Sequence, residues 1–385
     1  MQAEKASLRN GADLRIGFLG GGQLGRMTIQ AALDLDFRIE VLDPDSQCPC
    51  ARIAHRFTQG DLNDAEAVIE WGRSLDVVTV EIENVSTEGL TALKAMGVHV
   101  LPDPAHLALI RDKGTQKQFY AEHSIPTSDF SLVESGREEV LTRGLPVVQK
   151  LRTGGYDGRG VQVIRTEDEA RYAFDAPSLL EDAVDIDKEL SVIVARSTSG
   201  EVKTYPVVES VFNELNLVDY LVAPARISQA IEDEARRVAL SVVEAMDFVG
   251  LLAVELFLDK QGRILVNEVA PRAHNSGHHT IEACGTSQFE QHLRAILGLP
   301  LGDTAQRSAA AMLNLIGAPG ASGTPVYPAL GAALSEPGLH PHIYGKVAVR
   351  EGRKMGHVTV LAADADAAEK RVLDLRDHIS TVHAH

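Results

Sequence analysis

The chain has little cysteine, little tryptophan and no surplus of basic residues. Its 385 residues include 3 cysteines and 1 tryptophan, and 54 acidic residues outnumber 37 Lys and Arg to give a formal charge of −17. The sparse, odd cysteine count argues against a disulfide scaffold and favours a reducing compartment. The negative charge and the lack of a long basic run disfavour nucleic acid and anionic membranes as partners. An anionic substrate would therefore need a local cluster of cations.

Long apolar runs are also missing. No stretch approaches the roughly 18 apolar residues of a membrane-spanning helix, and residues 1–13 lack the apolar core of a secretory signal. We therefore expect a cytoplasmic protein that neither spans nor binds a membrane. With 44% hydrophobic and 24% charged residues, the composition is typical of a globular chain, and the length predicts two to four domains.

Two groups of residues are weak candidates for zinc ligands. Cys48 and Cys50 form only half of a zinc knuckle, because no second cysteine pair follows. His274, His278 and His279 are clustered, but clustered histidines more often bind substrate or pack in a core, and no fourth ligand is evident. We expect no zinc at either place.

Short apolar segments alternate with helical patterns between residues 14 and 102. Strands are expected at 14–19, 38–42, 76–81 and 98–100, and helices at 23–35, 64–73 and 87–95. This alternation predicts a parallel sheet with crossover helices. Farther along the chain, helices are expected at 115–123, 229–246 and 287–297.

Two acidic residues interrupt adjoining apolar strands. Glu255 lies within 251–258 and Glu268 within 264–269, with a turn expected at 259–262. If the hairpin loop is even in length, the side-chain period of two places both carboxylates on one face, within about 8 Å. Two acids on an apolar face repel unless a cation joins them, and Mg²⁺ prefers such hard oxygen ligands. The alternative is an independent surface glutamate on each strand.

The first of two glycine-rich loops follows the first strand. Residues 20–25 satisfy the G-x-G-x-x-G spacing, and Asp43 ends the next strand, where a dinucleotide fold places a ribose-binding acid. The same loop suits any anionic or polar ligand at a helix N-terminus, and it also suits a tight turn that packs a helix on a strand.

The second loop, residues 150–160, has four glycines in seven positions and is flanked by Lys150, Arg152 and Arg159. Its glycines free the backbone to move, and its cations can neutralise phosphate. Because it lacks the Gly-Lys-Ser/Thr ending of a Walker loop, we expect a flap over a triphosphate, with a plain hairpin loop as the alternative. The apolar strand at 179–184 ends in acids and would present its backbone to an adenine edge, while Glu189 bonds the ribose.

Together these motifs resemble the ATP-grasp superfamily, and within it the 5-(carboxyamino)imidazole ribonucleotide synthetases of purine biosynthesis. The segments that carry the resemblance occur in family order, at residues 22–27, 79–85, 115–117, 152–160, 267–278, 344–346 and 352–357. The resemblance implies a mixed α/β ATP-grasp fold and a homodimer. It implies a Rossmann-like N-terminal domain at 1–112, a lid subdomain with the glycine-rich flap at 113–200, a metal-binding catalytic subdomain at 201–318 and a small C-terminal domain at 319–385.

The activity that the resemblance implies is that of an ATP-dependent carbon–nitrogen ligase. Bicarbonate would attack the γ-phosphate of ATP to give carboxyphosphate, which would carboxylate the exocyclic amine of 5-aminoimidazole ribonucleotide. ATP and Mg²⁺ would be the cofactors, with Glu255 and Glu268 as the metal ligands. The implied catalytic residues are Arg272, which is placed to hold bicarbonate or carboxyphosphate, together with Asp157 and Asn275.

The resemblance also assigns two sets of binding residues. Those implied for ATP are Lys113, Lys150, Gly155, Tyr156, Asp157, Gly158, Arg159, Gly160, Glu181, Asp182, Ala183, Val184, Glu189, Phe212, Asn267 and Glu268. Those implied for the ribonucleotide are Gln23, Leu24, Glu83, Tyr156, Arg159, Arg272, His274, Asn275, Ser276, Lys346 and Arg353. Lys346 and Arg353 would hold the 5′-phosphate, and they are the local cations that a chain of charge −17 needs.

The chain departs from the family pattern at three positions. Ala270 stands where many ATP-grasp enzymes have Asn, Phe212 where relatives often have His, and Lys113 where some have Arg. One metal contact must then come from water or from elsewhere in the chain.

Three other functions stay open. A formate-dependent glycinamide ribonucleotide transformylase would share the ATP site, but residues 81–83 and the tail match the imidazole enzyme better. A nicotinamide-dependent oxidoreductase rests on residues 20–25 and Asp43 alone. A non-catalytic nucleotide-binding regulator does not need the full set of polar residues that the chain contains.

Overall fold

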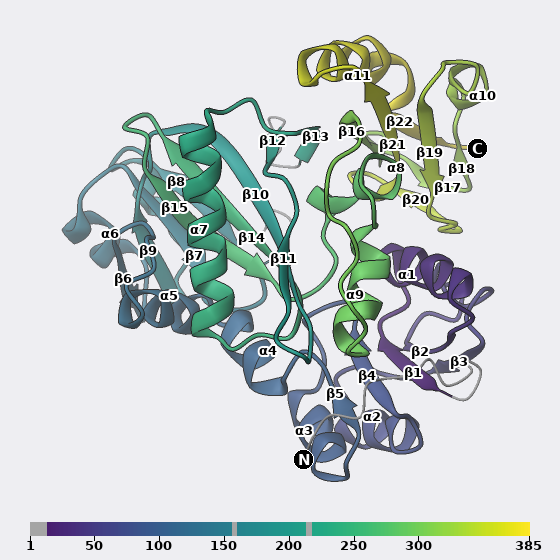
Figure 1. The fold of residues 1–385 in the computed structure, drawn as a ribbon. Helices are drawn as coiled ribbons and strands as arrows, with labels where there is room; N and C mark the ends of the chain where they lie inside the picture. The colour runs from purple at the N-terminus through teal and green to yellow at the C-terminus, as the bar shows by residue number, and fades with distance from the viewer. Residues whose placement is uncertain (1–13, 156–159, 213–217) are drawn as a thin grey trace.

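The computed structural model describes residues 14–155, 160–212 and 218–385 (Figure 1). Tyr156, Asp157, Gly158 and Arg159, all predicted site residues, lie outside the described residues. Within the described ranges, no helix combines the length and the apolar character needed to cross a membrane.

The N-terminal part is a parallel sheet, as the alternating pattern predicted. Its strand order is β3-β2-β1-β4-β5, and every neighbouring pair runs parallel. The strands are β1 (Arg15–Leu19), β2 (Arg38–Asp43), β3 (Arg56–Gln59), β4 (Val77–Val80) and β5 (His99–Val100), and the helices are α1 (Gln23–Asp34), α2 (Ala65–Gly72), α3 (Thr87–Ala95) and α4 (Pro104–Arg111). Asp64 and Ser86 begin α2 and α3 by accepting hydrogen bonds from backbone N–H groups of the first turn. The predicted elements are confirmed, while β3 and α4 were not anticipated.

A separate four-stranded antiparallel sheet follows, in the order β6-β9-β7-β8. It consists of β6 (Phe130–Val133), β7 (Val147–Leu151), β8 (Val161–Ile164) and β9 (Ser178–Asp182), with α5 (Lys113–Glu122), α6 (Arg137–Arg143) and the 3-10 turn η2 (Glu169–Tyr172) beside it. Its small core packs Val140 and Ala170 against Val147, Ile164 and Leu180.

The rest of the chain builds one 11-stranded sheet, in which eight strands follow the order β15-β14-β10-β12-β13-β16-β21-β19. Its strands are β10 (Ile186–Arg196), β11 (Val202–Thr204), β12 (Val208–Phe212), β13 (Val218–Ala223), β14 (Gly250–Asp259), β15 (Ile264–Ala270), β16 (Ala309–Gly317), β18 (Pro325–Val326), β19 (Leu339–Ile343), β21 (Lys354–Ala362) and β22 (Thr381–Ala384). The remaining elements are α7 (Gln229–Ala245), η3 (Asn275–Gly277), α8 (Thr280–Ala283), α9 (Gln288–Ile296), β17 (Ser322–Gly323), α10 (Leu330–Ala333), β20 (Val349–Arg350) and α11 (Ala365–Ile379).

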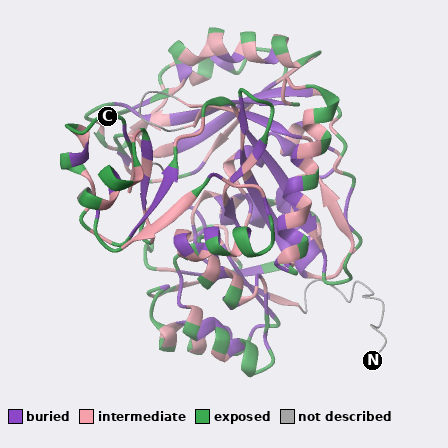
Figure 2. Cartoon of the chain, turned by 90° about the vertical axis from the view of Figure 1, so that its left-hand side faces the viewer, coloured by how far each residue is buried: buried purple, intermediate pink, exposed green. Residues whose placement is uncertain are grey.

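Helices cover this large sheet because its central strands are apolar on both faces. In Figure 1, α7 lies across the strands at one end and α11 covers the strands at the other end. The apolar side of α7, including Val238 and Val242, packs against Leu252, Val254 and Leu256 of β14. Figure 2 shows the result, with buried strands inside and exposed residues on the outer helix faces.

The hairpin of β14 and β15 does not have the even loop on which the face prediction depended. Asp259 donates its N–H to the carbonyl of Arg263 at 3.0 Å, which leaves an odd loop of residues 260–262. A β-bulge next to Glu255 then shifts the register by one residue, so that Glu255 lies directly opposite Glu268. The two carboxylates therefore share a face because of the bulge and not because of the loop.

Helix α9 joins the N-terminal sheet to the rest of the molecule. Phe289 on α9 is 1% exposed and packs in one cluster with Leu24 and Met27 of α1 and with Tyr344, which follows β19. Replacing Phe289 by alanine is expected to destabilise the protein by about 3–5 kcal/mol, because it leaves a cavity where three parts of the chain meet. Denaturant unfolding measures this loss, with exposed Met96→Ala as the control; equal unfolding midpoints would contradict it.

Candidate active site

The paired carboxylates each hold a basic side chain. Lys113, at the start of α5, forms an ion pair with Glu268, and His274 places its Nε2 3.1 Å from Oε1 of Glu255. Burial opposes ionisation of Glu268, but Lys113 and Lys150 outweigh it and lower the pKa of that carboxyl. Two carboxylates thus face each other beside Lys113 and Lys150, the two lysines that are candidates for binding phosphate.

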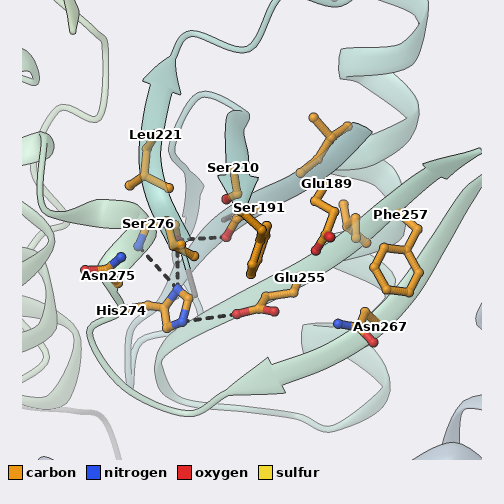
Figure 3. Close-up of a pocket in the computed structure, with 14 residues that line it drawn as sticks. Glu189, Ser191, Ser210, Leu221, Glu255, Phe257, Asn267, His274, Asn275 and Ser276 are labelled. Atoms are coloured by element: carbon orange, nitrogen blue, oxygen red, sulfur yellow. Dashed lines mark hydrogen bonds and ion pairs between the residues drawn. The ribbon is translucent and has the colours of Figure 1, made fainter. Parts of the chain in front are cut away.

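A pocket opens beside this acid pair, lined by strands β10, β12, β13, β14 and β15 and by the segment after β15 (Figure 3). Ser191 on β10 pairs with Glu255 across the sheet, so Glu189, two residues earlier, points to the same face. Burial, with Glu255 nearby, raises the pKa of Glu189 to about 7. Phe212 lines the same pocket.

The segment after β15 presents polar groups to this pocket. Nδ1 of His274 is 2.9 Å from the hydroxyl of Ser276, which in turn is 2.8 Å from the hydroxyl of Ser191, as the dashed lines in Figure 3 show. The side-chain amide of Asn275 is buried, and neither its nitrogen nor its oxygen has a hydrogen-bond partner among the described residues. Because a buried amide without partners is costly, Asn275 is a candidate for a ligand contact.

Lys150 projects from β7 toward the same region. Its ammonium lies 2.6 Å from Oε2 of Glu181 and 2.8 Å from the side-chain oxygen of Asn267, the unpaired residue of the bulge. Glu181 is also paired with Lys117 of α5, which is 2% exposed. Lys113, Lys117 and Lys150 line one small cavity, so cations gather next to the acid pair.

Arg272 follows β15 and links the large sheet to the N-terminal part. Its guanidinium is 2.9 Å from Glu83, and a second nitrogen donates to the carbonyl of Ala273 at 3.1 Å. Gln23 and Leu24 begin α1 after the first glycine loop, and the N–H of Leu24 donates to Glu81 at 3.1 Å. The side chain of Leu24 is buried in the cluster around Phe289, and its carbonyl accepts the hydroxyl of Thr28 at 2.8 Å.

The two predicted phosphate-binding cations lie in the C-terminal part. Lys346 donates to the carbonyl of Lys354 at 2.6 Å, and Arg353 donates to the carbonyl of Ala348 at 2.8 Å. The ring of His278 stacks on that of His357 on β21, with 4.6 Å between the ring centroids. This stack holds the strand after Arg353 against the segment that carries His274 and Asn275.

The remaining residues predicted for ATP binding lie on β9, in the link from β9 to β10 and beside the second glycine-rich loop. Asp182 is largely exposed and pairs with Arg143 at 2.7 Å, away from the acid pair, while Ala183 and Val184 connect β9 to β10. Gly155 and Gly160 border residues 156–159, which lie outside the described residues, and the carbonyl of Gly160 accepts the N–H of Leu151 at 2.8 Å. Glu181 has both carboxylate oxygens paired with lysines.

Sequence reasoning did not assign Lys117 or Ser191 to the site. Lys117 belongs to the segment 115–117 that carries the resemblance, and it shares its helix face with Gly114 and Tyr120, both buried; these were the available signals. Ser191 gave no signal, because a serine inside an apolar strand is common.

The acid pair is the part of the site that could hold a metal ion. Among the described residues, no group of three His, Cys, Asp or Glu is placed to hold a metal ion, and Cys48 and Cys50 are buried and free. Glu255 and Glu268 offer hard oxygen donors, and with substrate phosphates and water they fit Mg²⁺. Ala270, opposite Ala253 on β14, supplies no side-chain ligand.

Comparison with protein families covers most of the chain. Residues 14–111 match the ribonucleotide synthetase preATP-grasp domain, residues 118–289 the ATP-grasp domain, and residues 310–371 the phosphoribosylaminoimidazole carboxylase C-terminal domain. The predicted ATP-grasp fold with an N-terminal and a small C-terminal part is therefore confirmed.

Individual relatives match nearly end to end. The chain is 41% identical to N5-carboxyaminoimidazole ribonucleotide synthase of Brucella melitensis, over 92% of this chain and 98% of that protein. A crystal structure of N5-carboxyaminoimidazole ribonucleotide synthetase from Thermotoga maritima superposes with a TM-score of 0.90 at 41% identity, covering 97% of this chain and all of that one. The Aspergillus clavatus synthase, solved with ADP and 5-aminoimidazole ribonucleotide, gives a TM-score of 0.86 at 35% identity, covering 95% and 100%.

Proposed function

The chain belongs to the family of N5-carboxyaminoimidazole ribonucleotide synthetases, and from that premise we propose that it carboxylates 5-aminoimidazole ribonucleotide with bicarbonate and ATP in purine biosynthesis. One arrangement supports this function best. Glu255 and Glu268 face each other beside Lys113 and Lys150, and Arg272 follows the strand that carries Glu268. Metal-held phosphates, their lysines and an anion-binding arginine are the groups that phosphoryl transfer to bicarbonate requires.

In the first step an oxygen of bicarbonate attacks the γ-phosphorus of ATP, the bond to the β-phosphate oxygen breaks, and ADP leaves. Lys113 and Lys150 would bind the phosphate oxygens, and Arg272 would orient the bicarbonate. Glu255 and Glu268 would hold Mg²⁺, which when bound neutralises charge on the β- and γ-phosphates. The product of this step is carboxyphosphate.

In the second step the exocyclic amine of the ribonucleotide attacks the carbon of carboxyphosphate. The new N–C bond forms, the C–O bond to phosphate breaks, inorganic phosphate leaves and the amine loses a proton. Asn275 and His274 line the side of the pocket from which the ribonucleotide would approach, with its 5′-phosphate on Lys346 and Arg353. Asp157 remains a proposed catalytic residue.

Several further features are part of the same proposal. We propose Mg²⁺ as the resident metal, a homodimer as the assembly and the cytoplasm as the location. The division of the chain at residues 112, 200 and 318 also remains a proposal. Size-exclusion chromatography with light scattering measures the assembly, and a mass near 41.5 kDa would contradict a dimer.

ADP release from Mg-ATP and bicarbonate, with and without 5-aminoimidazole ribonucleotide, tests the function. Release that depends on the ribonucleotide is the expected result. Stimulation by glycinamide ribonucleotide plus formate instead would keep the ATP site and overturn the substrate. Tight NAD binding without turnover would overturn both.

Replacing Arg353 by alanine is expected to raise the KM for the ribonucleotide by about 10- to 100-fold and the KM for ATP by less than about twofold. The reason is that a charge-assisted contact to the 5′-phosphate is lost while the ATP site stays intact. Steady-state kinetics with each substrate varied in turn measures the split. Arg237→Ala, an exposed arginine paired only with Glu234 among the described residues, is the control. Equal increases in both KM values would remove the phosphate assignment.

A further inference from the structure

Lys117 is buried although it carries a charge. It lies on α5 at 2% exposure and donates to Thr127 and to Ser128, the latter at 3.0 Å. Its main partner is Oε1 of Glu181. Burying an ammonium ion is costly unless the ion is paired, so the burial of Lys117 requires an explanation.

The reason lies in the other oxygen of Glu181. Oε2 of this carboxylate is 2.6 Å from the ammonium of Lys150, while Oε1 takes Lys117 and the hydroxyl of Ser128 at 2.9 Å. The three side chains therefore form a buried row with charges plus, minus and plus. Their sum is one positive charge, and Lys150 is the member at the nucleotide-binding end, 2.8 Å from Asn267.

The net charge of this row falls to zero if Lys117 is removed. Lys150 and Glu181 would then form a neutral pair. The carboxylate of Glu181 would neutralise the charge of Lys150, which would then attract a phosphate less strongly. The neighbouring cation Lys113 is already matched by Glu268. Lys117 is thus the group that makes this corner of the site cationic.

We propose that Lys117 is a positioning residue for the nucleotide phosphates: it neutralises Glu181 and so keeps Lys150 available to the anion. The inference rests on the proposed function, because it concerns the same ATP site. It also gives Glu181 a role different from a direct nucleotide contact, since both of its oxygens are engaged by lysines.

The titration of the row supports this role. Burial lowers the pKa of Lys117 to about 8, with Glu181 opposing the shift and with Lys150 and Lys113 adding to it. Burial opposes ionisation of Glu181, but Lys150 and Lys117 outweigh it and hold its pKa at about 2. Glu181 is therefore anionic at neutral pH, while Lys117 loses its proton as the pH rises through about 8.

The test measures ADP binding by isothermal titration calorimetry to wild type, Lys117→Met, Glu181→Gln and the double variant, each with EDTA and with Mg²⁺. Lys117→Met is expected to weaken ADP binding about 10- to 100-fold, as suits one charge lost a few ångströms from the anion in a partly buried site. The double variant is expected to bind within about threefold of wild type, because its net charge is again one positive. Lys203→Met, whose ammonium contacts Leu301 and Gly302 away from the site, is the control.

The outcomes separate the alternatives. If the double variant stays as weak as Lys117→Met, then Lys117 touches the nucleotide directly and the proposal is overturned. If Glu181→Gln alone loses affinity about tenfold, Glu181 is a direct ligand and the proposal is again overturned. Should Lys117→Met fail to fold, wild type and the double variant alone decide, because near-equal affinity is required of them. Absence of ADP binding in wild type would instead overturn the proposed function.

A pH series adds a readout that a merely structural role would not move. Wild-type ADP affinity is expected to fall as the pH rises through about 8, where Lys117 becomes neutral. The double variant lacks both Lys117 and its acid, so this fall should be absent. The same fall in both proteins would contradict the assignment.

Discussion

Glutamine in place of Glu268 is expected to lower ribonucleotide-dependent ADP release by about a thousandfold or more, with the fold unchanged. The substitution keeps the volume but removes one of the two anionic donors that face each other across β14 and β15. A metal that neutralises phosphate charge is worth several kcal/mol of transition-state stabilisation, which is the size of this loss. Coupled-enzyme measurement of ADP under saturating Mg²⁺ gives the rate.

A second readout is needed because Glu268 also pairs with Lys113. Electron paramagnetic resonance of Mn²⁺ with ADP reports metal binding directly, and we expect it to weaken strongly in Glu268→Gln. Glu244→Gln, an exposed residue of α7, is the control and should change neither quantity. Near-normal turnover, or normal Mn²⁺ binding with lost turnover, would remove Glu268 from the metal site.

Alanine in place of Arg272 is expected to lower kcat by about 100- to 1000-fold while ADP affinity changes by less than about twofold. An arginine aimed at a developing anion acts mainly in the transition state, and loss of one such donor has effects of this size. The measurement pairs steady-state kcat with calorimetric ADP affinity. Arg272→Lys should recover only part of the rate, because lysine keeps the charge but lacks the planar fork.

Glu83 provides the matched comparison for Arg272, since the two side chains are 2.9 Å apart. If Arg272 acted only through that ion pair, Glu83→Gln would reproduce the loss in kcat. We expect Glu83→Gln to act mainly on the ribonucleotide KM. A loss of ADP affinity in Arg272→Ala as large as the loss in kcat would place this arginine with the nucleotide instead.

Local patterns predicted much of the fold because the physical causes are local. Strands β1, β2 and β4 are apolar and bounded by turn residues. Strands that alternate with helices in this way usually form a parallel sheet with right-handed crossovers. Helices α7 and α9 follow from apolar spacing and from the serines that cap their first turns. The pairing of β16 with β21, which joins the C-terminal part to the large sheet, had no such local signal.

The sequence by itself determined which residue types are available to the site: two carboxylates on adjoining strands, a glycine-rich loop flanked by one lysine and two arginines, and cations near the C-terminal end. Only the tertiary structure decided how they meet. The odd loop at residues 260–262 would have set Glu255 and Glu268 on opposite faces, and a bulge reversed this. The row from Lys117 through Glu181 to Lys150 likewise joins three elements, because a buried charge finds its partner through packing across the fold and not through spacing along the chain.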